Sequence, residues 1–125
     1  MRLLLDTHVF IWAVMASPLL KAAQRRQIEG ADRVYVSSAS VWEVAIKSRL
    51  GKIDANADDI LAAIDASGFV ELAVSGQHAA CVARLPLHHN DPFDRILVAQ
   101  SITEPLRLMT ADAALAPYGE TVLMI

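Results

Sequence analysis

Short apolar runs alternate with longer segments along this chain, and this alternation limits the possible folds more than any other feature. The runs have the length and composition of β-strands, and they cover residues 2–5, 33–37, 69–74, 106–109 and 121–125. The intervening segments have the length of helices and cover residues 7–15, 19–29, 39–50, 57–66, 76–85 and 93–103. Strands that alternate with helices require crossover connections. We therefore predict an α/β fold with three layers, α/β/α, around a mostly parallel sheet of about five strands.

Local signals support several of these elements. Residues 2–5 (RLLL) are apolar at three successive positions, which is typical of a strand buried on both faces. Helix-start signals precede or open three helices: they are Ser17-Pro18, a capping box formed by Ser40 and Glu43, and Asp91-Pro92. Glycines should end three helices: they are Gly30, Gly51 and Gly68.

The composition is that of one folded domain. Apolar residue types make up 54% of the 125 residues and charged types 20%, which favours a packed core over disorder. We expect residues 1–125 to form a single domain. Cys81 is the only cysteine and is predicted to be a small core residue. The chain therefore has no disulfide framework and no cysteine-based metal site, in keeping with a reducing cytoplasm.

Charge and hydropathy exclude several further classes. Asp6, Thr7 and His8 interrupt the first apolar run and no cleavage site follows, so we expect no targeting segment. No uninterrupted apolar stretch reaches the roughly 18 residues of a membrane span, and we expect a cytoplasmic protein without membrane contact. The formal net charge of −3 argues against gripping nucleic acid by bulk charge. Binding to a polyanion would need local basic patches or metal ions held by acids.

Carboxylates recur where the predicted strands end. Asp6 directly follows residues 2–5, Glu43 lies early in the helix after residues 33–37, and Asp112 follows residues 106–109. Asp94 opens the last long helix. Ligand sites of parallel sheets form outside the carboxyl ends of the strands, so we expect these acids to converge.

Each acid also has a structural explanation when taken alone. Asp6 could cap the helix that starts at Thr7, and Glu43 could pair with Lys47 one turn later. Asp91 could be the N-cap before Pro92, Asp94 could favour the helix dipole, and Asp112 could cap the turn that follows it.

The set of acids together indicates a metal site. Several carboxylates in one partly desolvated pocket repel each other unless cations join them. Oxygen ligands select Mg²⁺ or Mn²⁺, and such ions activate water and stabilise the leaving oxygen of a phosphodiester.

Motifs in four regions resemble those of the PIN-domain family, specifically the VapC-like toxins of toxin–antitoxin pairs. The motifs are LLLDTHVFIW, SSASVWEVAIKSRLGKI, HHNDPFDRILVAQ and LMTAD, which occur in the family's order over nearly the whole chain. The resemblance implies a single PIN domain and a Mg²⁺- or Mn²⁺-dependent endoribonuclease that inhibits translation. It also implies a cognate antitoxin that blocks the site, and a homodimer. The segment SITEPLRL departs from the family's small-residue pattern, which puts the length of the preceding helix in doubt.

The resemblance also assigns roles to individual residues. The four catalytic and metal-binding acids are Asp6, Glu43, Asp94 and Asp112, with Asp91 as an auxiliary acid. Polar residues that match positions near the family's site are Thr7, Ser38 and Thr110. Basic residues that we expect to contact RNA are Lys47, Arg49 and Arg95, although the first two also suit a helix C-terminus. The adjacent His88 and His89 could position their loop or contact RNA.

Other classes of protein remain open from the residues alone. A phosphoaspartyl phosphatase usually has a second Asp two residues after the first, where this chain has His8. A receiver-like module needs paired acids after its first strand, and LLLDT supplies one. A catalytically inert PIN-like module that only binds a partner protein would be favoured by loss of an acid, and all four are present.

Overall fold

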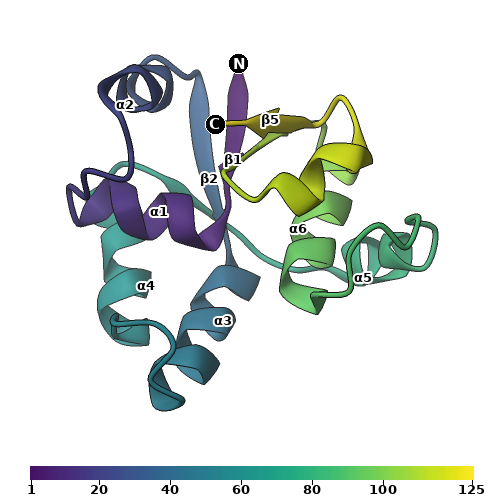
Figure 1. Cartoon of the computed structure of the whole chain (residues 1–125), viewed down its shortest axis with the longest axis horizontal. Helices are drawn as coiled ribbons and strands as arrows, with labels where there is room; N and C mark the ends of the chain where they lie inside the picture. The colour runs from purple at the N-terminus through teal and green to yellow at the C-terminus, as the bar shows by residue number, and fades with distance from the viewer.

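The computed structural model describes residues 1–125, and a five-stranded sheet in the order β3-β2-β1-β4-β5 forms its middle layer (Figure 1). The strands are β1 Arg2–Leu5, β2 Arg33–Ser37, β3 Val70–Leu72, β4 Arg107–Thr110 and β5 Val122–Met124. Every neighbouring pair is parallel, and Leu5 of the central strand lies between Val36 and Met109. The predicted α/β fold is confirmed, and the sheet is parallel throughout.

Helices cover both faces of this sheet. They are α1 Thr7–Val14, α2 Ala22–Glu29, α3 Ser38–Arg49, α4 Ala57–Ala66, α5 Gly76–Val82 and α6 Pro92–Thr103, followed by the 3₁₀ helix η1 Ala113–Tyr118. In Figure 1, α1 and α4 lie to the left of β1 and β2, and α5 and α6 lie to the right. None of the helices is long and apolar enough to cross a lipid bilayer.

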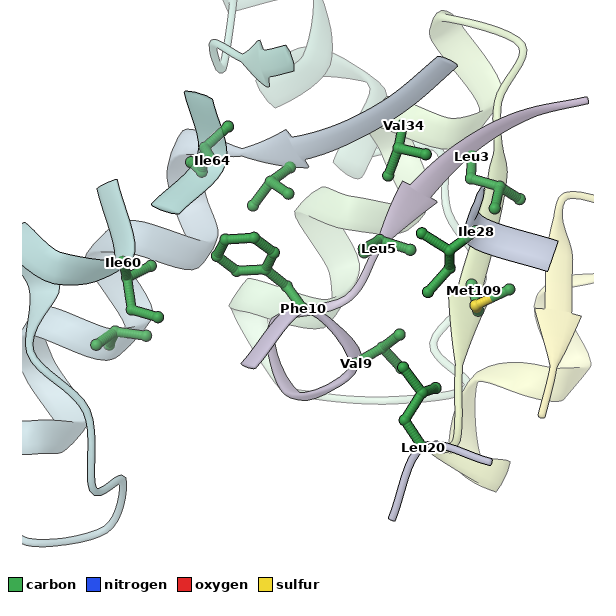
Figure 2. Packing of buried hydrophobic residues seen from close by; sticks show 12 residues of the cluster. Leu3, Leu5, Val9, Phe10, Leu20, Ile28, Val34, Ile60, Ile64 and Met109 are labelled. Carbon is green, nitrogen blue, oxygen red and sulfur yellow. The ribbon is translucent and has the colours of Figure 1, made fainter. Parts of the chain in front are cut away.

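Two hydrophobic clusters hold the layers together, one on each face of the sheet. On one face, Leu3 and Leu5 pack with Phe10 of α1 and Ile60 of α4 (Figure 2). On the other face, Leu4 packs with residues of α5, α6 and η1, including Cys81. Successive side chains of a strand point to opposite faces. The uninterrupted run of leucines in β1 is therefore explained by burial on both sides.

Some helix boundaries differ from those expected. Helix α2 begins at Ala22 rather than residue 19, because the Ser17 hydroxyl accepts a hydrogen bond from the Leu19 backbone and this segment forms a turn. Helix α5 ends at Val82 rather than residue 85, because residues 83–85 make only the tighter i→i−3 hydrogen bonds.

The predicted capping box of Ser40 and Glu43 is wrong. Ser37 is the N-cap of α3, and its hydroxyl accepts from the backbone N–H of Ala39 at 3.0 Å. The helix therefore begins one residue earlier than expected, and the side chain of Glu43 is available for other contacts. The ends near Gly51 and Gly68 are confirmed, and both residues adopt a positive φ that suits glycine.

The strand order reverses between β1 and β4. Strands β2 and β3 lie on one side of β1, and the later strands β4 and β5 lie on its other side. In open α/β sheets the crevice outside the strand ends at such a reversal is the usual ligand site. Asp6 follows β1 and Asp112 follows β4, so both acids lie at this crevice.

Candidate active site

Asp6 is a buried carboxylate that serves two elements at once. As the N-cap of α1, it accepts from the backbone N–H of Val9 through Oδ1 at 2.7 Å. Its Oδ2 accepts from the hydroxyl of Thr110, the last residue of β4, at 2.5 Å. Burial raises the pKa of Asp6, and the charge of Glu43 adds to that effect, although these two hydrogen bonds act in the opposite direction. The side chain therefore lies where negative charge is unfavourable.

Thr110 links Asp6 to Asp112. While its hydroxyl donates to Asp6, it also accepts from the backbone N–H of Asp112 at 3.0 Å. Asp112 caps η1 through Oδ1, which accepts from Ala114 at 3.0 Å. Its second oxygen lies 3.8 Å from Nε2 of His89. One threonine thus positions two of the predicted acids at the end of β4.

Glu43 is buried on the first turns of α3, with only 3% of its surface exposed. Its Oε1 accepts from the hydroxyl of Thr7 at 2.6 Å, and that hydroxyl lies 2.9 Å from the hydroxyl oxygen of Ser40. Its Oε2 forms an ion pair with Lys47 at 2.5 Å. Desolvation lowers the pKa of Lys47, but the hydrogen bond to Glu43 and the charges of Glu43, Asp91 and Asp94 outweigh it and raise that pKa. Lys47 is therefore a fixed cation beside the acids.

The start of α6 brings in two further acids. Asp91 is its N-cap, and Oδ1 accepts from the backbone N–H groups of Phe93 and Asp94 at 2.8 and 3.1 Å. The other oxygen of Asp91 lies 3.9 Å from the Lys47 ammonium. Burial raises the pKa of Asp94 to about 6, and the charges of Asp91 and Glu43 contribute, although a hydrogen bond to His89 opposes them. The charged form of Asp94 is therefore disfavoured first by burial and then by repulsion from the neighbouring acids.

His89 completes the tightest group of ligand atoms. Its Nε2 lies 2.9 Å from Oδ2 of Asp94, and one ligand atom from each of His89, Asp94 and Asp112 lies within 4.8 Å of the others. Asp6 and Glu43 adjoin this group without belonging to it. His89 is not among the metal ligands expected from the sequence. Its position five residues before Asp94, in a loop that leads into α6, was the available signal.

Two residues predicted near the site have other roles. The hydroxyl of Ser38 accepts from the backbone N–H of Val74 at 3.1 Å, and Ser40 occupies the polar position beside Thr7 and Glu43 instead.

Arg95 is buried, and its guanidinium donates to the carbonyl oxygens of Val82, Pro86 and His89 and to Tyr118. Successive residues of a helix point about 100° apart. Arg95 therefore points away from the direction of Asp94 and is bonded within the protein, and its contact with RNA stays a prediction. Arg49 is exposed near the end of α3.

The residues present fit a divalent cation. All four predicted acids lie at the carboxyl edge of the sheet, around the end of β1. Asp6 follows β1 and Asp112 follows β4, whereas Glu43 lies on α3 and Asp94 lies on α6. The raised pKa values of Asp6 and Asp94 show that burial and mutual repulsion disfavour their charged forms. A cation would relieve both effects, and a set rich in carboxylate oxygens suits Mg²⁺ or Mn²⁺.

The sequence profile of the PIN domain matches residues 3–120. Because the match spans nearly the whole chain, this protein belongs to the PIN-domain family. No curated protein matches the sequence of this chain.

Solved structures of toxin–antitoxin proteins share the fold. A chain of VapBC2 from Rickettsia felis, bound to a DNA fragment from its promoter, aligns with a TM-score of 0.67 at 13% identity, covering 100% of this chain and 98% of that one. A chain of DNA-bound VapBC from Salmonella typhimurium gives 0.68 at 16% identity, covering 99% and 98%. A chain of a toxin–antitoxin complex from Klebsiella pneumoniae gives 0.63 at 17% identity, covering 97% and 95%. At these identities the likeness establishes the shared fold.

Proposed function

We propose that this protein is a metal-dependent endoribonuclease and the toxin of a toxin–antitoxin pair. The observation that supports this most is the convergence of four acids, two of them buried, at the reversal of strand order, where the pKa of Asp94 is raised to about 6. Membership of the PIN-domain family adds the reaction class, since the resemblance implies hydrolysis of RNA phosphodiesters. Its inhibition of translation would follow from cutting RNA.

The proposed roles divide the site residues into ligands and positioning groups. Mg²⁺ or Mn²⁺ would be held by the four acids Asp6, Glu43, Asp94 and Asp112. The chemistry that such an ion supplies is activation of water and neutralisation of charge on the scissile phosphodiester. Thr7 and Thr110 fix the orientation of Glu43 and Asp6 through their hydroxyl groups. Asp91 caps α6, and its second oxygen lies 3.9 Å from the Lys47 ammonium that Glu43 binds.

The partners follow from the same family. The similar chains come from complexes that contain an antitoxin, so we propose that a cognate antitoxin covers this site and suppresses cleavage. We also propose a homodimer and a cytoplasmic location. Helix α3 and its C-cap carry exposed apolar side chains at four-residue spacing, Trp42, Ile46 and Leu50, which form one stripe.

Cleavage of RNA by the purified chain tests the proposal. The native protein should cut single-stranded RNA with Mg²⁺ or Mn²⁺ present and stop when excess chelator is added. Asp94→Asn should lose at least about a hundredfold in rate, since the ligand is lost while the helix N-terminus keeps its Asp91 cap. Asp58→Asn, an exposed acid in the first turn of α4, is the matched control and should cut like the native protein.

Three outcomes would contradict the proposal. Cleavage that persists in chelator would exclude the metal mechanism. Equal rates for native protein and Asp94→Asn would exclude this acid site as the source of the activity. If no RNA is cut under any condition while the chain still binds an antitoxin, the inert PIN-like binding module is the correct interpretation.

A further inference from the structure

We propose that His89 is a nitrogen ligand of the metal centre and that it makes the centre favour Mn²⁺ over Mg²⁺. This inference rests on the proposed function, because it adds a ligand to the same acid site. It goes beyond the four-acid arrangement that the family resemblance implies, in which every protein ligand is an oxygen.

The distances allow one ion to contact His89 and two of the acids. Nε2 of His89 lies 2.9 Å from Asp94 Oδ2 and 3.8 Å from Asp112 Oδ2, and all three ligand atoms lie within 4.8 Å of one another. Ligand atoms bonded at about 2.1 Å to one octahedral ion lie about 3 Å apart when adjacent and about 4 Å apart when opposite. The separations of Nε2 from the two carboxylate oxygens, 2.9 and 3.8 Å, fall within these limits, so one ion can contact His89 and both acids after a small adjustment of the side chains.

A buried guanidinium holds the backbone that presents this imidazole. Arg95 donates to the carbonyl oxygen of His89 at 3.4 Å and to that of Pro86 at 3.0 Å, which ties the loop to α6. The Tyr118 hydroxyl donates to the same Pro86 carbonyl at 3.0 Å. Ligands held in advance lose less conformational freedom on binding. The loop is therefore built to place the side chain of His89 beside Asp94.

The neighbouring histidine has a different environment. The ring of His88 is exposed and packs edge-on against Tyr118, with ring centroids 5.1 Å apart. Its contacts are thus on the side of η1 and not among the acids. This pair of adjacent histidines supplies a ligand and a matched control in one dipeptide.

A nitrogen ligand changes which ion the site prefers. Mg²⁺ takes oxygen ligands almost exclusively and keeps several waters, whereas divalent first-row transition metals also accept nitrogen ligands, with Mn²⁺ the weakest binder among them. Replacing one water or oxygen ligand by the imidazole of His89 therefore favours Mn²⁺ relative to Mg²⁺. In the alternative arrangement, His89 only hydrogen-bonds to Asp94 and stays outside the coordination shell.

Pulsed electron paramagnetic resonance on the Mn²⁺-loaded full chain distinguishes these arrangements. Native protein and His88→Gln should show modulation from a directly bonded ¹⁴N nucleus, and His89→Gln should lose it. Direct titration should show that His89→Gln binds Mn²⁺ at least about tenfold more weakly, because even partners behind a metal ligand are worth 10–100-fold in affinity. Its affinity for Mg²⁺ should change much less. Thermal melts of the metal-free variants verify that all three proteins fold.

The outcomes separate this inference from the proposed function. Native protein that binds Mn²⁺ without ¹⁴N modulation would overturn the role of His89 and leave the four-acid centre intact. Modulation that survives in His89→Gln would also overturn it, since the nitrogen would come from another residue. A native chain that binds Mg²⁺ but not Mn²⁺ would overturn the inference alone, and a native chain that binds neither ion would overturn both proposals.

Discussion

At the scale of single residues, capping a helix and holding a metal are compatible roles for one carboxylate. Asp6, Asp91 and Asp112 each use one oxygen to cap a helix. The second oxygen of Asp6 accepts from Thr110, that of Asp91 faces Lys47, and that of Asp112 faces His89. Because a carboxylate has two oxygens, one acid can cap a helix with the first and bind a metal ion with the second.

Substitution of Asp6 separates these two roles. Without metal, Asp6→Asn should melt at the native temperature or higher, because asparagine caps about as well and the raised pKa of Asp6 shows its charge to be unfavourable there. With Mn²⁺ at 100 times its dissociation constant, native protein should gain about 2.7 kcal/mol and the variant much less. Thermal melts with and without Mn²⁺ measure both effects, with Asp58→Asn responding like native protein. An equal gain for Asp6→Asn and native protein would show that Asp6 is not a ligand.

The raised pKa of Asp94 predicts how the metal-free protein depends on pH. The folded pKa is about 6 and the unfolded value is about 4, so between these values the folded state binds more protons than the unfolded state. The contribution of Asp94 to stability is therefore greatest below pH 4 and is lost as the pH rises through 6. In chelator, the melting temperature of Asp94→Asn relative to native protein should rise between pH 4 and pH 7. A difference that stays constant over this range would contradict the buried, repelled state of Asp94.

At the scale of elements, the loop before α6 depends on one buried side chain. Arg95 is 9% exposed and bonds three carbonyl oxygens and Tyr118, joining α5, the loop and η1. Hydrogen bonds to a charged group contribute more than neutral ones, and carbonyls left unpaired cost further free energy. The position of His89 thus depends on a residue that does not itself contact the acids.

Arg95→Met should therefore destabilise the fold by about 3 kcal/mol and weaken Mn²⁺ binding as well. Arg49→Met is the control for stability, because Arg49 is exposed near the end of α3. It should leave stability within about 0.5 kcal/mol of native and, if Arg49 contacts RNA, lower RNA affinity. Urea unfolding and Mn²⁺ titration of both variants make the comparison. Native stability for Arg95→Met would show that this network contributes nothing to the loop.

At the scale of the whole molecule, the fold leaves one helix with an apolar outer surface. Trp42 is 62% exposed and Ile46 37% exposed on α3, and its C-cap Leu50 is 62% exposed, while Val44 on the opposite side of the helix is buried. Trp42 also contacts Phe93 of α6 edge-on at 5.0 Å, next to the acids. The stripe and the active site are therefore adjacent, so an association that covers the stripe lies beside the site.

The proposed homodimer predicts that this stripe controls the oligomeric state. The double variant Trp42→Ser and Ile46→Ser should sediment as a monomer at concentrations where native protein is a dimer, because its apolar contact area is lost. Leu61→Ser and Leu87→Ser, which alter exposed leucines elsewhere, should keep the native state. Analytical ultracentrifugation measures the change. A double variant that remains dimeric would place the interface on another face.

The sequence alone determined the layered architecture and the edge of the sheet where the acids lie. Strands that alternate with helices are expected to run parallel, and parallel strands end at the same edge, so Asp6 and Asp112 were placed on one edge, and the adjacency of β1 and β4 then brings them together. The choices between neighbouring residues follow from how the chain packs: Ser40 rather than Ser38 lies beside Glu43, Asp94 lies in the site while Arg95 is buried away from it, and His89 lies among the acids while His88 packs on Tyr118. These choices depend on the rotation of each helix about its axis and on the path of one loop. Both are set by packing between residues far apart in the chain, which local pattern does not encode.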